Sequence, residues 1–429
     1  MDPNTVGSEF DAIIVGSGTC GATIARELGK RNKKVLMLER GGNAALKETL
    51  GAFAAMGDRV QVGEDSERRR PIATMRALTT GGSTGMYFAL ATQPPVETFR
   101  ALGIDLSKEV ETVTKELPIA PLPDELLSTQ AKKLRESAAS LGHAWDKREL
   151  FVDASKCTSS YSYEAKWKAR AYVDDAIASG ATLVNRATVN KVLINGNRAI
   201  GVEYRQKKGL FGSETRRVYG AKIILAAGEV ASPKILRDSG VEGVGDRGFY
   251  FNPGLALYGI VPKMKGTDSF IGSMGCVYDD GIELGDANCT RLLHRMLMIG
   301  EGKLKHMFSF PECLGIGVKI KDGLAGRLRE DGQFHKTIDR EDRLKLKKGT
   351  QEAMKILRKC GARDIVELGI AAAGRVGGLI RISEHVDAKL ETQYRNLHVC
   401  DGSIIPDDMR GTPTLTLVCL GRYLARQLN

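Results

Sequence analysis

Three glycines and one acid near the start of the chain have the types and spacing of a dinucleotide-binding site. Gly16, Gly18 and Gly21 form a G-x-G-x-x-G pattern, and Glu39 follows eighteen residues after the last of them. Glycine at these positions allows a tight turn, a close approach of a pyrophosphate to the backbone, and close packing of the helix that follows. A carboxylate at this distance accepts hydrogen bonds from ribose hydroxyls. We therefore predict that this segment binds a dinucleotide.

Two strands and a helix must position these residues. The apolar run 12–15 predicts a strand, the Ala-rich pattern up to Gly29 predicts a helix, and the run 34–38 predicts a second strand that ends beside Glu39. In such a βαβ unit the helix N-terminus offers N–H groups and a positive dipole end to the phosphates. NAD and FAD both bind this unit, and an ordinary βα turn is the alternative. Its place at the start of a long chain favours FAD.

A second glycine-rich segment, 78–92, reads LTTGGSTGMYFALAT. Gly81, Gly82 and Gly85 suit a loop that a flat ring or a phosphate approaches closely, and a turn that enters a helix is an equally good interpretation. Glycine-rich turns also follow strand patterns near residues 228 and 402. Because ligands bind at the carboxyl ends of parallel strands, these turns are expected to converge on one ligand.

The rest of the chain alternates helix and strand patterns. Segments 105–117, 123–142, 163–180, 232–240 and 341–361 predict helices, 181–202 predicts a hairpin around Asn195 and Gly196, and 254–320 predicts a mainly antiparallel sheet. The highly charged segment 57–71 is predicted to be a loop. Residues 1–10 resemble a cloning remnant and are left out of the fold prediction.

Length and composition indicate a soluble chain of two domains. The 429 residues are 42% hydrophobic, and no segment approaches the ~18–20 apolar residues of a membrane helix or the pattern of a signal peptide. Eight cysteines without a CxxC pair favour a reduced, cytoplasmic chain without a metal site. The net charge of +11 is spread along the chain without a nucleic-acid motif, so a solvated face is favoured, and contact with a membrane surface stays open.

Three segments together resemble the glucose-methanol-choline (GMC) flavoprotein oxidoreductases. They are VGSGTCGATIARELG with the following LERGG, AAGEVASPKILRDSGV at 226–241, and the closing NLHVCDGSIIPDDMRGTPTLTLVCLGRYLA. The resemblance implies an α/β fold with a Rossmann-type FAD-binding domain at 11–100, 184–250 and 388–429. It also implies a discontinuous α+β substrate domain at 101–183 and 251–387, built on a mainly antiparallel sheet.

The same resemblance implies which residues hold FAD. The backbone of Val189 is expected at the adenine, Asp401 and Gly402 at the ribityl and pyrophosphate groups, and the Thr414 amide at the pyrimidine edge of the flavin. The expected cofactor-binding residues are Gly16, Ser17, Gly18, Thr19, Cys20, Gly21, Glu39, Arg40, Gly81, Gly82, Ser83, Val189, Ala227, Gly228, Asp401, Gly402, Thr412 and Thr414. The family attaches covalent flavin through a histidine in the loop that matches 81–88; none is present here, so non-covalent FAD is expected.

The chain departs from the family pattern where the family has its catalytic base. Arg375 matches the catalytic histidine, and Thr412 matches the second catalytic His or Asn. Arginine stays protonated and cannot act as a general base, whereas it is well suited to bind a carboxylate, an enolate or a phosphate beside the flavin. The alternative is that Arg375 forms a structural salt bridge and another group does the chemistry. Substitutes considered for the base are Tyr87, Tyr161, Tyr163, His294 and His306.

Three functions remain open at this point. The favoured one is an FAD-dependent oxidoreductase that acts on a small or medium-sized organic substrate, with an anionic substrate among the candidates and an unidentified electron acceptor. The second is a redox-neutral flavoprotein, such as an isomerase, a lyase or a light-driven enzyme. The third is a non-catalytic FAD-binding assembly protein, which the missing histidine allows.

Overall fold

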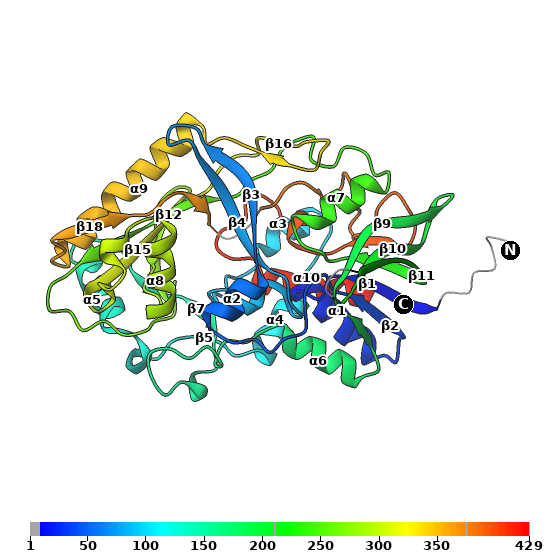
Figure 1. Ribbon diagram of the computed structural model, residues 1–429, viewed down its shortest axis with the longest axis horizontal. Helices are drawn as coiled ribbons and strands as arrows, with labels where there is room; N and C mark the ends of the chain where they lie inside the picture. Colours follow the sequence, from blue (N-terminus) through cyan, green and yellow to red (C-terminus); the bar gives the residue numbers. More distant parts are fainter. Residues whose placement is uncertain (1–8, 210–211, 374–375, 429) are drawn as a thin grey trace.

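A parallel sheet forms one end of the molecule (Figure 1). The computed structural model describes residues 9–209, 212–373 and 376–428. The sheet order is β8 (Thr182–Val184), β2 (Val35–Leu38), β1 (Phe10–Val15), β11 (Gly212–Leu225), β10 (Arg198–Lys208) and β9 (Ala187–Asn195), with β20 (Leu397–Val399) also on β11. β1, β2, β8, β11 and β20 pair in parallel, whereas the predicted hairpin β9–β10 adds antiparallel to β11. β1 and β2 are almost entirely buried, as apolar runs in a covered parallel sheet should be.

An antiparallel sheet forms the other end. Its order is β18 (Asp364–Glu367), β12 (Pro253–Ile260), β15 (Cys313–Ile320), β14 (Ile282–Asp286), β13 (Met274–Asp279) and β6 (Asp146–Lys147), with β19 (Ala371–Ala372) also on β12. The prediction of a mainly antiparallel sheet within 254–320 is confirmed. Helix α8 (Arg291–Gly300), which the sequence reading passed over, interrupts that segment.

Helices cover both sheets. The helices are α1 (Thr19–Gly29), α2 (Leu50–Met56), α3 (Val96–Ala101), α4 (Ser107–Glu116), α5 (Thr129–Ala139), α6 (Arg170–Ala178), α7 (Ala231–Asp238), α8, α9 (Arg340–Lys359) and α10 (Thr414–Gln427). α1 packs between α6 and α10 beside the parallel sheet, and α9 packs on β12, β14 and β15. The predicted helices at 105–117, 123–142, 232–240 and 341–361 are present, whereas the one at 163–180 begins only at Arg170.

The prediction of a loop at 57–71 is wrong. This segment contains β3 (Gly57–Asp65) and the start of β4 (Arg70–Ala77), which form a long two-stranded ribbon that reaches toward α9 (Figure 1). Its charges pair with distant elements, since Arg343 on α9 binds Asp65 at 2.9 Å and Arg68 binds Glu367 at 2.7 Å. The many charged residues of this segment therefore belong to an exposed ribbon and not to a loop, because a two-stranded ribbon with one solvated face accommodates polar side chains.

Shorter ribbons complete the fold: β5 (Ile119–Pro121) with β7 (Glu149–Phe151), and β16 (Arg327–Leu328) with β17 (Phe334–His335). β1 begins at Phe10, so this residue belongs to the fold rather than to the segment set aside from it. β8 begins at Thr182, two residues before the expected domain boundary, and the division into domains stays a prediction. Among the described residues, no helix is long and apolar enough to cross a membrane.

Candidate cofactor and substrate site

The first glycine-rich turn is closed by contacts that only glycine permits. Gly16 has a φ of 100°, and a Cβ added there would lie 2.4 Å from the Ala226 carbonyl oxygen. A Cβ at Gly21 would lie 2.0 Å from the Gly16 carbonyl oxygen, so strand and helix touch through their backbones. In contrast, a Cβ at Gly18 would meet no atom within 4 Å. The turn is thus tightly packed at Gly16 and Gly21 and has open space beside Gly18, which is where a pyrophosphate would approach.

Glu39 lies at the carboxyl end of β2 and faces this turn. Its Oε2 accepts hydrogen bonds from the backbone N–H (3.0 Å) and the hydroxyl (2.7 Å) of Ser17, and its Oε1 accepts one from the Gly41 N–H at 2.6 Å. The residue is only 6% exposed. A carboxylate has about four acceptor positions, so these three bonds fix its orientation and leave capacity for a ribose hydroxyl.

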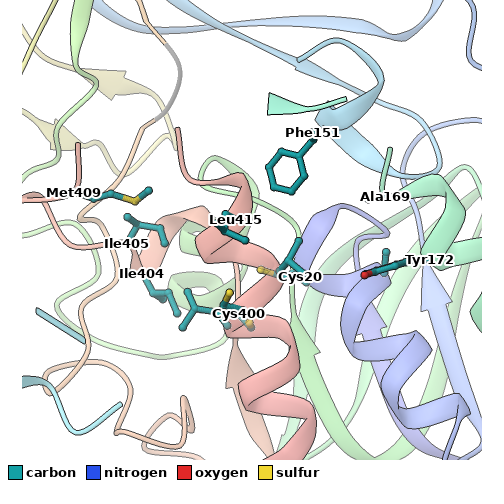
Figure 2. Close-up of a cluster of buried hydrophobic side chains, with 14 of the residues drawn as sticks. Cys20, Phe151, Ala169, Tyr172, Cys400, Ile404, Ile405, Met409 and Leu415 are labelled. Carbon is teal, nitrogen blue, oxygen red and sulfur yellow. The ribbon is translucent and has the colours of Figure 1, made fainter. Parts of the chain in front are cut away.

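Two helices begin at the same edge of the parallel sheet. Near their starts, the Cys20 thiol of α1 donates to the Leu417 carbonyl of α10 at 3.2 Å, and near their ends Arg31 donates to the Leu428 carbonyl at 2.9 Å, so the helices run in the same direction. Figure 2 shows Cys20 and Leu415 side by side at these starts. Neither first turn contains an acid or a side-chain cap. The positive ends of both helix dipoles therefore converge where Thr19 and Thr414 begin the helices.

A second turn, at the carboxyl end of β11, is held by Asp401. Its Oδ2 accepts from the Gly228 N–H at 2.9 Å and from the Ser232 hydroxyl, and its Oδ1 accepts from the Ser403 N–H (2.9 Å) and hydroxyl (2.6 Å). Burial raises the pKa of the Asp401 carboxyl above its usual value, and these hydrogen bonds act in the opposite direction. Ala227 joins the same network through its N–H to Ser232 at 3.1 Å. Asp401 thus ties the turn after β11 to the turn after β20, which contains Gly402.

The second glycine-rich loop lies against the first. The Gly81 N–H donates to the Ser17 hydroxyl at 3.3 Å, and a Cβ added at Gly82 would lie 2.8 Å from the Gly18 Cα. Both glycines have positive φ, and the following η2 (Gly82–Gly85) is a single 3-10 turn. Ser83 accepts from the Ala77 N–H at 3.3 Å. The absence of side chains at Gly81 and Gly82 therefore lets this loop pack directly against the backbone of Ser17 and Gly18.

Two expected cofactor residues lie at the margins of this region. Val189 is buried on β9, a strand that starts next to Glu39, since the Ala187 N–H donates to the Glu39 carbonyl at 2.9 Å. The Arg40 guanidinium donates to Asp58 at 2.7 Å and is thus held by the base of the β3–β4 ribbon.

We call residues 16–21, 39, 81–83, 227–228 and 401–402 the nucleotide corner.

The two expected catalytic residues differ in what the structure describes. Arg375 lies outside the described residues. Thr412 precedes α10, with its N–H donating to the Thr92 hydroxyl at 3.0 Å and its hydroxyl donating to the Leu90 carbonyl at 3.0 Å. After the gap in the described residues, Gly377 pairs with Tyr250, the Tyr250 N–H donating to the Gly377 carbonyl at 3.0 Å. Thr412 is therefore anchored on the segment that follows the 81–85 loop.

A charged cluster that the sequence reading missed lies on the antiparallel sheet beside Thr412. Glu283 on β14 and Lys319 on β15 are direct cross-strand partners with an ion pair of 3.0 Å. The Gly411 N–H donates to Glu283 Oε1 at 3.3 Å, which places this face of the sheet next to the segment that enters α10. The pKa of Glu283 is lowered: burial acts to raise it, and the charges of Lys319 and Arg148 outweigh burial.

Arg148 lies across a row of residues with almost no side chains. Gly275, Gly285 and Gly317 are direct partners on adjacent strands and share this face. A Cβ at Gly275 would lie 2.6 Å from the Arg148 Nη2, and one at Gly285 would lie 3.1 Å from its Nη1. The guanidinium donates to the Leu284 carbonyl at 3.1 Å, and no acid among the described residues pairs with it within 4.0 Å. We call this glycine row, with Arg148, Glu283 and Lys319, the substrate face.

A weak signal for the substrate face is present in the sequence. The segments IELGD and CLGIGVKI alternate apolar residues with glycine or charge, the period of a strand whose second face is not filled by apolar side chains. Nothing in the sequence links Arg148 to these strands, because it lies over 120 residues earlier, between the short strands β6 and β7.

The substitutes considered for the missing base are engaged elsewhere. The hydroxyl of Tyr87 donates to the Trp167 carbonyl, that of Tyr161 donates to Glu48 (2.8 Å) and that of Tyr163 donates to the Gly85 carbonyl (2.8 Å). Burial raises the pKa of all three phenols. His294 is buried on the inner side of α8, where burial lowers its pKa to about 4, and His306 faces Asp364 at 3.7 Å. Among the described residues, the hydrogen-bond partners of Thr412 are Thr92 and Leu90, and none of these candidate bases.

Comparison with known proteins decides the family. The family profile described as GMC oxidoreductase matches residues 10–247, more than half of the chain. The chain belongs to the GMC oxidoreductase family. It is 26% identical over 260 residues to an uncharacterised GMC-type oxidoreductase of Mycobacterium tuberculosis, a match that covers 54% of this chain and 39% of that protein. It is 23% identical to an uncharacterised protein of Methanocaldococcus jannaschii, with 98% of this chain and all of that protein covered.

Solved structures agree on the fold. The crystal structure of pyridoxine 4-oxidase from Mesorbium loti superposes with a TM-score of 0.69 at 18% sequence identity, covering 98% of this chain and 99% of the other. The α/β architecture expected from the sequence is thus confirmed for this GMC oxidoreductase. The chain spans well under half the length of the M. tuberculosis relative, so family membership alone does not carry over a whole protein's activity.

FAD is the cofactor of this GMC oxidoreductase, and the residues present fit it. The open space before Gly18 and the two acid-free helix starts suit a pyrophosphate, and the oriented Glu39 suits a ribose. The expected role of each individual residue stays a prediction.

Proposed function

We propose that this chain is an FAD-dependent oxidoreductase that acts on a small or medium-sized organic anion. The observation that supports this best is the charge of the substrate face. Arg148 and Lys319 place two cations beside a single carboxylate, Glu283, next to the segment that enters α10. A carboxylate or similar anion would balance the second cation, and the planar guanidinium of Arg148 suits its two oxygens.

Arg148 covers Gly275 and Gly285, and the third glycine of the row, Gly317, leaves room for such a substrate beside the guanidinium. Gly317 has only the Gly285 carbonyl and the Ala287 Cβ within 4 Å of an added Cβ, both at 3.8 Å or more. Arg148 would bind the anionic end, the Thr412 region would border the reacting end, and Arg375 would add a further cation there. FAD, when bound, supplies the capacity to take two electrons from the substrate.

The proton that leaves a hydroxyl substrate needs an acceptor other than the expected pair. Arg375 cannot accept a proton, and the Thr412 hydroxyl is committed to the Leu90 carbonyl. Glu283 is a carboxylate beside this segment, since it accepts from the Gly411 N–H, but its lowered pKa makes it a weak base. We therefore propose that alcohol oxidation is slow and that substrates which react without losing a hydroxyl proton are preferred.

A redox-neutral flavoprotein is the second candidate. The replacement of both family catalytic side chains, by Arg375 and Thr412, favours it, because an anion held beside FAD can be isomerised or cleaved without a net change of redox state. A non-catalytic FAD-binding assembly protein is a third, weaker candidate.

Anaerobic mixing separates these candidates. Purified holoprotein is mixed with pairs of compounds that differ only in a carboxylate and have no hydroxyl proton to lose, such as an amino acid and the matching amine, and with simple alcohols, while the visible flavin band is followed. Bleaching by the acid alone supports the proposal, and bleaching by alcohols alone contradicts an anionic substrate. Unchanged spectra with product formation support the redox-neutral candidate, and neither signal supports the third.

An Arg148→Met variant tests the assigned anion site. Loss of a charged hydrogen bond costs ~1.5–3 kcal/mol, so the bleaching concentration of the acid should rise roughly 10- to 150-fold. The matched control is Arg135→Met on α5, whose partner is the exposed Asp124 and which lies off the substrate face. If both variants respond alike to the acid, Arg148 does not bind it.

A further inference from the structure

The outer surface of α8 and of the turn that follows carries exposed apolar side chains. Ile299, Leu304 and Phe308 are 52%, 59% and 69% exposed, and all three lie within ten residues of sequence. Arg295, Lys303 and Lys305 lie among them and are also exposed. We call these six residues the α8 patch. Single exposed apolar residues are ordinary, whereas a contiguous apolar group with a polar rim marks an interaction surface.

Local geometry brings Arg295, Ile299 and Phe308 to one side of α8, next to the turn that contains Lys303, Leu304 and Lys305. The Lys303 N–H donates to the Met298 carbonyl at 2.7 Å, which turns the chain back at the end of α8. The Arg295 guanidinium lies 5.3 Å from the Phe308 ring centroid, so the returning chain covers the same side of the helix as Ile299, four residues after Arg295.

The opposite side of α8 is anchored in the fold. Met298 and His294 are fully buried, and the His294 ring contacts the rings of Tyr258 and Phe310 edge-on. Tyr258 lies on the face of the antiparallel sheet opposite the one that Leu357 of α9 covers through Gly259. Because the inner side is packed, the α8 patch is a fixed surface at the end of the molecule away from the parallel sheet (Figure 1).

The acids around the patch are already neutralised. Glu301 binds Arg70 at 3.1 Å and accepts from the Gly369 N–H at 3.1 Å. Asp364 faces His306 at 3.7 Å and Lys305 at 4.0 Å. Arg295 and Lys303 have no ion-pair partner within 4.0 Å among the described residues. The patch is therefore apolar with a net positive rim.

We propose that the α8 patch docks the protein on the surface of an anionic lipid membrane. Apolar side chains that enter the headgroup region and cations that meet anionic lipids are the two components of interfacial binding. A second copy of the chain fits less well, because a two-fold contact would place two patches with the same net positive charge against each other. A nucleic acid would leave Ile299 and Leu304 without apolar partners.

Vesicle sedimentation of the FAD-loaded protein tests this docking. We expect binding to vesicles of phosphatidylcholine mixed with phosphatidylserine, weakening as salt is added, and little binding to phosphatidylcholine alone. The double variant Leu304→Ser/Phe308→Ser should weaken binding at least about tenfold, from the apolar area withdrawn. Its matched control, Leu344→Ser/Met75→Ser, removes side chains that are 58% and 55% exposed elsewhere and should bind like the wild type.

A charge-reversal pair tests the cationic rim separately. Lys303→Glu/Lys305→Glu should weaken binding about 25-fold or more, at about fivefold for each lysine near an anionic surface. Lys347→Glu/Lys359→Glu on α9 makes the same charge change at exposed positions and should have a much smaller effect. Retained flavin colour and an unchanged unfolding midpoint establish that each variant is folded.

Three outcomes overturn the proposal. They are absence of binding to the mixed vesicles, equal losses in the patch variants and their controls, and a wild-type dimer in solution that the patch variants dissociate. The last result would assign the patch to a second copy of the chain.

Discussion

The nucleotide corner and the substrate face both consist of glycine backbone and a few charged groups. They differ in how their residues are distributed along the sequence. In the corner the dinucleotide pattern from Gly16 to Glu39 is contiguous in sequence, and the turns near residues 81, 228 and 402 join it from distant segments. Glu39 and Asp401 are held by three and four hydrogen bonds from strand-end turns. On the substrate face, Arg148 reaches a glycine row formed by distant strands. The centre of the corner is a single βαβ unit, whereas the substrate face exists only once the antiparallel sheet has formed.

The largest expected effect is on the unfolding free energy and concerns a buried ion pair, Lys336 with Asp322, on the substrate side of the molecule. The Lys336 ammonium is buried with Asp322, at 2% and 0% side-chain exposure, and donates to the Phe249 (2.9 Å) and Gly323 (2.6 Å) carbonyls. Asp322 in turn accepts from the N–H groups of Phe251 and Asn252. Lys336→Met leaves that carboxylate without its counter-charge, so we expect a loss of ~3–5 kcal/mol of unfolding free energy in urea.

The control for this variant is Lys347→Met, at an exposed lysine of α9, which should change the unfolding free energy by less than ~0.5 kcal/mol. FAD affinity of the folded Lys336→Met protein should stay unchanged, because the pair lies outside the nucleotide corner. A variant that kept its stability but lost FAD would reverse the assignment of the pair to the substrate side.

The next effect belongs to the corner. Glu39→Ala should weaken FAD retention by roughly 10- to 150-fold, since losing hydrogen bonds to a charged group costs ~1.5–3 kcal/mol. Equilibrium dialysis of FAD measures this. Glu39→Gln keeps one acceptor oxygen and the side-chain volume, and should lose less. Unchanged affinity in Glu39→Ala would show that another residue holds the ribose.

These two regions also differ in how far the sequence could predict them. The glycine spacing, the acid after β2 and the hairpin at Asn195 were predictable because turn geometry and strand periodicity are local properties. The β3–β4 ribbon was missed because its charges are satisfied by α9 and β18, which no local pattern reveals. Arg148 and Lys336 were missed for the same reason, since their roles depend on partners that tertiary folding supplies.

A pH effect of intermediate size tests the packing under α8. Burial lowers the pKa of His294 to about 4, below its usual value, and neither ring nitrogen has a hydrogen-bond partner among the described residues. Between pH 6.5 and 4 the unfolded chain therefore binds a proton that the folded chain does not, and stability falls as the pH falls through this range. His294→Leu should remove this loss, worth roughly 3 kcal/mol.

Buried acids with a raised pKa act in the opposite direction, and they are the same in the wild type and in His294→Leu. Burial raises the pKa of Asp286 and of Asp342 to about 6, so each favours the folded state as the pH falls from 6 to 4. The difference between wild type and His294→Leu in urea melts across this range isolates the histidine. A constant difference from pH 7 to 4 would mean that the ring is solvated in the folded protein.

The smallest effect tests whether the two regions meet at FAD. By the family resemblance Arg375 belongs beside the flavin, and a fixed cation there stabilises the negative charge that FAD gains on reduction. Removing it should lower the reduction potential. For Arg375→Ala we expect a drop of some tens of millivolts, because ~30 mV corresponds to ~1.4 kcal/mol for two electrons, the size of a modest charge interaction. Arg375→Lys keeps the charge and should stay closer to the wild type. The same midpoint for wild type and Arg375→Ala in a potentiometric titration would remove Arg375 from the flavin, and Arg148 would then be left as the main cation of the substrate site.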